Sequence, residues 1–182
     1  MTSENEKETE LRERRLRIIE SRKRNELRAA YGLKLVSVLS ETTGAALSLA
    51  DFKIDSVAPY ALEWPRRISD APGLVAAYVS RAAVSDLLNC LDREFGALNG
   101  QIGFHDKTYL GLARIAGVHV TALASAAEAS EDSVILYVED PQGVILVDFY
   151  RSPPGDPFSV VIQGEELVQR SRRGGCGRFE KR

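Results

Sequence analysis

Catalysis or metal binding would depend first on the two histidines of this chain, and neither has the neighbours that such chemistry requires. His105 follows a glycine-rich turn and precedes Asp106, Lys107 and Tyr109, whereas His119 lies in an alternating apolar run that predicts a strand. A zinc site needs several His, Cys or acidic ligands at short spacings, and neither histidine has them. We therefore predict no metal, no cofactor and no catalytic residue, and keep a small-ligand site or active site near His105 as a third hypothesis.

The two cysteines, Cys90 and Cys176, are far apart in the chain and differ in their surroundings. Cys90 lies in an apolar helical run and is predicted to be a small core residue. Cys176 lies among glycines and arginines, where neighbouring positive charge would lower the pKa of a free thiol. Two cysteines do not make the paired framework of a small secreted protein, so we predict a reducing, intracellular location, cytoplasm or nucleus.

Basic residues at both ends of the chain are the strongest compositional feature. Residues 1–30 carry nine Lys and Arg against seven Glu, and residues 169–182 carry six against one, although the whole chain has a net charge of −2. Such clusters are typical of surfaces that bind phosphates or acidic proteins. The candidate residues for binding nucleic acid or an acidic partner are Arg14, Arg15, Arg17, Arg22, Lys23, Arg24, Arg28, Arg170, Arg172, Arg173 and Arg178.

Four of these arginines, Arg14, Arg17, Arg24 and Arg28, would share one side of a helix and could follow a phosphate backbone. Glutamates between them neutralise much of that charge. The segment between the ends is acidic, so two other interpretations stay open: the basic ends bind this acidic middle of the same molecule, or they bind an acidic protein partner.

The N-terminal segment is predicted to form a charged helix over residues 4–30. It opens with a capping box at Ser3 and Glu6, has no Gly or Pro before Gly32, and contains Glu-to-Arg pairs four residues apart. Its apolar stripe of Leu16, Ile19, Leu27 and Ala30 is interrupted by Lys23, so it makes at most two imperfect coiled-coil heptads.

The pattern changes after Gly32. Strands are predicted at 33–39, 46–52, 60–64, 101–104, 118–124, 134–138, 144–150 and 158–162, and helices at 73–98, 107–116 and 164–171. The clearest element is the hairpin around Asp140-Pro141-Gln142-Gly143, whose residues suit a tight turn. This order predicts an α+β fold, an antiparallel sheet with a long core helix on one face.

Together these features predict three regions: a charged N-terminal helix (1–31), an α+β globular domain (32–168) and a basic flexible tail (169–182). No apolar segment is long enough to span a bilayer, so no membrane partner is expected. The first functional hypothesis is a non-enzymatic interaction or scaffold subunit whose helix pairs with itself or with a protein partner. The second is a nucleic-acid-binding protein, RNA before DNA, that uses the basic helix and tail.

Overall fold

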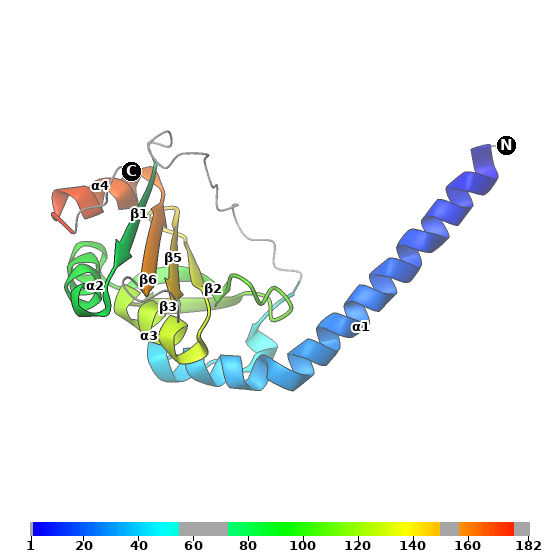
Figure 1. The fold of residues 1–182 in the computed structure, drawn as a ribbon, viewed down its shortest axis with the longest axis horizontal. Coiled ribbons are helices and arrows are strands. Elements are labelled where there is room, and N and C mark those ends of the chain that lie inside the picture. Colours follow the sequence, from blue (N-terminus) through cyan, green and yellow to red (C-terminus); the bar gives the residue numbers. More distant parts are fainter. Residues whose placement is uncertain (1, 55–72, 150–156, 177–182) are drawn as a thin grey trace.

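The computed structural model describes residues 2–54, 73–149 and 157–176, with side chains described from residue 9 onward. A long helix, α1 (Thr2–Thr43), precedes a compact head that contains six strands and three further helices. The predicted α+β class and antiparallel sheet are confirmed. Figure 1 shows α1 leaving the head as an arm and bending where it reaches it, so that the head lies inside the angle made by the two limbs of the helix.

The head is built on one antiparallel sheet whose strand order is β1-β6-β5-β4-β2-β3. Its strands are β1 (Leu74–Val79), β2 (Leu98–Phe104), β3 (Ala113–Val118), β4 (Val134–Val138), β5 (Gly143–Phe149) and β6 (Phe158–Gln163). Side chains of a strand alternate between the two faces of a sheet. The strands β4, β5 and β6 therefore contribute to two apolar clusters, one on each face.

The larger cluster lies between the sheet and the helices. It combines alternate strand residues such as Leu136 and Ile145 with side chains of α1, α2 (Arg81–Phe95), α3 (Val120–Ser130) and α4 (Glu165–Arg173). The helix α3 packs on β4 and β5, and it also contacts α1 and α2. Burial of these aliphatic side chains is the main driving force for folding of the head, at about 25 cal/mol for each Å² of apolar surface removed from water.

The hairpin β4–β5 and the strand β6 occur where the sequence predicts them, and α4 continues to Arg173. The predicted strands at 33–39 and 46–52 are wrong, because α1 runs on to Thr43 and a short 3-10 helix, η1 (Leu49–Asp51), follows it. Leu35, Val36 and Leu39 are buried at helical spacing, and this contact with the head holds the segment in the helix. The boundary predicted at residues 31/32 thus falls inside α1.

Three other predictions in the head are wrong. The helix predicted at 73–98 is divided into β1, α2 and the start of β2, because Ser80 caps α2 by accepting a hydrogen bond from the Ala83 N–H at 3.3 Å. The helix predicted at 107–116 is wrong, because residues 113–116 belong to β3, and the strand predicted at 118–124 is wrong, because residues 120–124 belong to α3. The strand predicted at 60–64 lies outside the described residues.

Candidate functional site

The arm of α1, defined here as residues 9–26, is the part of the structure that is most open to a partner. Every one of its side chains is exposed, and Figure 1 shows it projecting away from the head. Five of the predicted binding residues lie on it with their charges in water: Arg14, Arg15, Arg22, Lys23 and Arg24. The arm therefore does not fold back on the acidic residues that the structure describes in the head.

Two further predicted residues of α1 already have partners within the protein. Arg17 makes an ion pair with Glu13 at 3.4 Å within the helix. The guanidinium of Arg28 donates hydrogen bonds to the backbone carbonyls of Leu49, Phe52 and Leu110, at 2.6, 2.8 and 3.0 Å. Arg28 thus anchors α1 to two loops of the head, and the predicted side of four arginines is not free as a track for phosphates.

The anchor of α1 continues with apolar contacts. Leu35, Val36 and Leu39 are buried in the larger cluster, and α1 packs on α3. A Cβ atom on Gly32 would lie 2.9 Å from Cδ1 of Leu49, so a larger residue here would require the end of the Leu49 side chain to move. A fixed base and an exposed continuation therefore belong to one unbroken helix.

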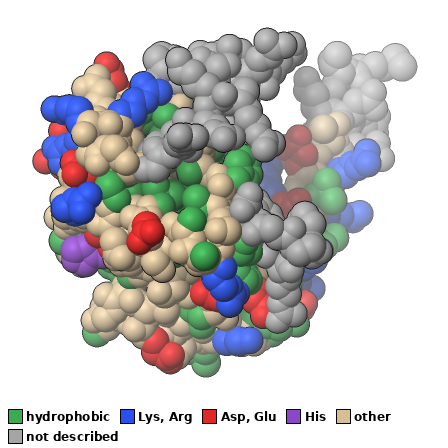
Figure 2. Space-filling model, turned by 60° about the vertical axis from the view of Figure 1, so that its left-hand side comes forward, with side chains coloured by type: hydrophobic (Ala, Val, Ile, Leu, Met, Phe, Trp, Pro, Cys, Tyr) green, Lys and Arg blue, Asp and Glu red, His purple; other side chains and the backbone are tan. Residues whose placement is uncertain are grey.

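The basic residues near the C-terminus do not join those of the arm. The Nε of Arg170 donates a hydrogen bond to Oε1 of Glu166, one turn earlier in α4, at 3.1 Å. Arg172 and Arg173 are exposed. Figure 1 shows α4 and the arm at opposite sides of the head. On the face drawn in Figure 2, Lys and Arg side chains alternate with Asp and Glu and do not gather into one basic patch. Arg178 lies outside the described residues.

Cys90 and Cys176 form a disulfide bond, which no sequence pattern predicted. Residues 169–176, assigned by sequence to a flexible tail, form the end of α4 and a segment that brings the buried Cys176 against α2. The prediction of a reducing compartment rested on unpaired cysteines, whereas disulfides are typical of oxidising environments. The spacing of 86 residues gave no sequence signal, because only the fold brings α2 and α4 together.

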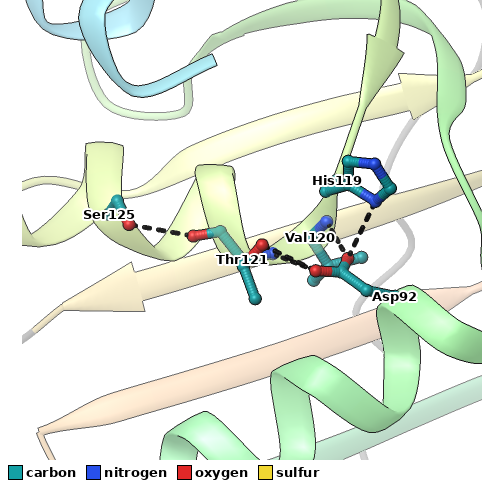
Figure 3. A network of polar contacts seen from close by, with 5 residues as sticks. All are labelled: Asp92, His119, Val120, Thr121 and Ser125. Atoms are coloured by element: carbon teal, nitrogen blue, oxygen red, sulfur yellow. Dashed lines mark hydrogen bonds and ion pairs between the residues drawn. The ribbon is translucent and has the colours of Figure 1, made fainter. Parts of the chain in front are cut away.

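A polar network around Asp92 has the residue types of a catalytic site but the geometry of a helix cap (Figure 3). The Asp92 carboxylate, on α2, accepts hydrogen bonds from the N–H groups of Val120 and Thr121 and from the Thr121 hydroxyl. His119 precedes α3, and its Nδ1 is 3.8 Å from Asp92. An activated hydroxyl would donate to the histidine, whereas this one donates to the carboxylate. Asp92 therefore caps α3 and ties it to α2.

The residues that follow His105 also have structural partners. Lys107 makes an ion pair at 2.8 Å with Asp132, whose side chain is only 4% exposed. The hydrogen bond to Asp132 raises the pKa of Lys107, and burial raises the pKa of Tyr109. A lysine that acts as a base or nucleophile needs a lowered pKa. This cluster therefore suits an ion pair that holds the loop after β2, and His105 itself contributes its backbone N–H to the Ser133 carbonyl at 2.8 Å.

Within the described ranges, no three His, Cys, Asp or Glu side chains are placed to hold a metal ion. No described helix is long and apolar enough to cross a membrane. Comparison of the chain with protein families, with curated proteins and with solved structures found no match. The exposed arm is therefore the candidate site on which the functional argument depends.

Proposed function

We propose that this protein is a non-enzymatic interaction subunit that binds a protein partner through the arm of α1, with the α+β head as its anchor. The observation that carries the proposal is the contrast within one helix: residues 28–39 are fixed to the head, whereas every side chain of residues 9–26 is exposed. A segment that stabilised only its own chain would bury one of its sides against the head.

The composition of the arm supports a partner. Four large aliphatic side chains, Leu11, Leu16, Ile18 and Ile19, are exposed on it. Most of the stability of a protein helix comes from packing of an apolar side against other elements, and the described head packs on none of the arm's side chains. Binding of a partner along the arm would bury these side chains and stabilise the helix.

The head supports a non-enzymatic role. Its most suggestive polar groups, Asp92 with Thr121 and Lys107 with Asp132, are engaged with each other and with the ends of secondary-structure elements. These contacts rigidify the head and thereby the base of the arm.

Site-specific photocrosslinking in cells of the native source tests the proposal. A benzophenone amino acid at Ile19 should give discrete protein adducts on irradiation. The matched control is the same amino acid at Tyr78, an exposed aromatic residue on β1 of the head, where we expect no adduct. Absence of adducts from Ile19, or equal adducts from both positions, would contradict the proposal.

Nucleic-acid binding is the second candidate, because the arm exposes seven Lys and Arg against four Glu. It predicts that affinity for a labelled RNA duplex or single strand falls steeply with salt, by roughly tenfold per neutralised phosphate for each tenfold rise in salt concentration. Replacement of Arg15, Arg22 and Lys23 by Gln should reduce that slope by about three. Binding that is absent, or unchanged by salt, would leave the protein partner as the function of the arm.

A further inference from the structure

We infer that the partner of the arm is a second copy of this chain, and that two α1 helices pair antiparallel along a stripe that faces away from the head. This inference rests on the proposed function, because it names the occupant of the arm. The stripe, called the outer stripe below, consists of Leu16, Ile19, Lys23, Glu26, Ala30 and Leu33.

The spacing of the outer stripe is that of a coiled-coil seam. Its residues follow one another at alternate intervals of three and four, as the a and d positions of heptads do. All six side chains are exposed, including Leu16 at 51%, Ile19 at 61% and Leu33 at 69%. The helix thus presents apolar side chains in a seam that nothing in the described part of the chain covers.

The head leaves this seam accessible. At about 100° of rotation per residue, the docking residues Gly32, Leu35 and Leu39 lie nearly opposite the outer stripe, and the fourth docking residue, Val36, lies about 110° from its centre. The head also lies inside the angle between the two limbs of α1 (Figure 1), so it turns away from a helix that packs on the other side. The head therefore does not cover the outer stripe of its own helix.

The order of side chains along the stripe favours an antiparallel pair. In chemical type the stripe has the same sequence from both ends: two apolar residues, two charged residues of opposite sign, two apolar residues. A two-fold axis between residues 24 and 25 sets Leu16 against Leu33 of the second copy, and Ile19 against Ala30. The same axis sets Lys23 against Glu26 of the second copy, and this pair occurs twice.

A parallel pair lacks this complementarity. It would stack Lys23 on Lys23 and Glu26 on Glu26 in consecutive layers, and like charges at a seam are unfavourable. The antiparallel arrangement also brings Glu13 near Lys34 of the second copy at the edge of the seam. Among the ion pairs of the described residues, none involves Lys23 or Glu26, and both side chains are exposed.

Two charged layers among six make this pair specific in register at some cost in stability. We therefore expect a reversible dimer with a Kd on the order of 10 µM. Sedimentation equilibrium of the full chain, from about 1 to about 200 µM, should show the molar mass rise from one chain to two.

Charge substitutions test the central layers. Lys23→Glu sets carboxylate against carboxylate and should raise the Kd at least tenfold, whereas Arg24→Glu, the same change at the next residue but outside the seam, should alter it by less than about threefold. The double variant Lys23→Glu/Glu26→Lys should restore dimerisation. Equal effects of the two single substitutions, or no rescue, would overturn the seam. Because these side chains are exposed, the melting temperature of the head should stay unchanged and verify folding.

A distance between the two copies can distinguish an antiparallel from a parallel pair of α1 helices. A spin label at Glu10→Cys, attached with the Cys90–Cys176 disulfide intact, should give a distance of about 45 Å between copies in an antiparallel dimer and about 10 Å in a parallel one, from the rise of 1.5 Å per residue. A short distance would overturn the antiparallel arrangement.

A monomer at every concentration would also overturn the inference. In that case the photocrosslinks from Ile19 test the proposed function separately. Adducts with a different protein would support a protein partner for the arm, whereas absence of any adduct would contradict both the proposed function and the self-pairing.

Discussion

The arm and α4 are both basic helices near the ends of the chain, and each has an Arg–Glu ion pair four residues apart, yet they differ in their contacts with the head. The arm exposes all its side chains, whereas α4 buries Leu167 and Val168 and is followed by the disulfide to α2. Charge is similar in the two helices and therefore does not decide which one docks. The difference comes from buried apolar side chains and from one covalent link, and it makes the arm the segment that is free for a partner.

The largest expected contrast comes from the same leucine substitution in each region. Leu167→Ala should lower the free energy of unfolding by about 3–4 kcal/mol, because it leaves a cavity in a fully buried site. Leu16→Ala, on the arm, should change it by less than about 0.5 kcal/mol. Urea unfolding at a concentration well below dimer formation measures both. A large decrease from Leu16→Ala would mean that the arm packs on its own head.

Removal of the disulfide should weaken the attachment of the C-terminal segment to the head. The double variant Cys90→Ala/Cys176→Ala should lower the free energy of unfolding by about 2–4 kcal/mol, because the bond closes a long loop in the unfolded chain. A reducing agent should destabilise the native protein by a similar amount and leave the double variant unchanged. Equal stability with and without the bond would show that apolar contacts alone hold α4.

Substitutions of two arginines one turn apart, Arg28 and Arg24, test where the docked part of α1 ends and the exposed arm begins. Arg28→Met should cost about 2 kcal/mol, because it removes the charged donor from three backbone carbonyls. Arg24→Met, one turn earlier and exposed, should cost less than about 0.5 kcal/mol. Thermal unfolding of the two variants side by side gives the comparison, and similar decreases in stability would move the end of the anchor into the arm.

The smallest effect concerns pH and separates charges of the head from those of the arm. Hydrogen bonding to Asp132 raises the pKa of Lys107 in the folded protein. The stabilisation by this pair is therefore complete below the ordinary lysine pKa of 10.5 and is lost as pH rises through the folded value. Lys107→Met should cost about 1 kcal/mol at neutral pH, and the difference from the native protein should shrink in alkaline solution.

Lys23→Met on the arm provides the control for this pH effect, and it should show no such dependence. Because burial also raises the pKa values of Tyr109 and Tyr137, the native protein itself should lose stability above about pH 10. Only the difference between each variant and the native protein therefore tests the ion pair. A constant difference for Lys107→Met up to high pH would contradict its role.

Local sequence signals determined several features of this protein. The Glu-to-Arg spacing and absence of Gly and Pro before Gly32 indicated the arm, and Asp140-Pro141-Gln142-Gly143 indicated the β4–β5 hairpin, because both depend on contacts between near neighbours. The alternation of apolar residues also indicated an antiparallel α+β head.

Tertiary contacts decided the rest. The segment 33–39 alternates like a strand, yet it is helical because Leu35, Val36 and Leu39 dock on the head. In the sequence Arg28 looks like the other basic residues of α1, and only the folded chain places the carbonyls of Leu49, Phe52 and Leu110 within hydrogen-bonding distance of it. Likewise, Cys90 and Cys176 can form a disulfide only because α4 packs on α2. These partners are distant in sequence, so their effects depend on the folded chain and leave no local pattern.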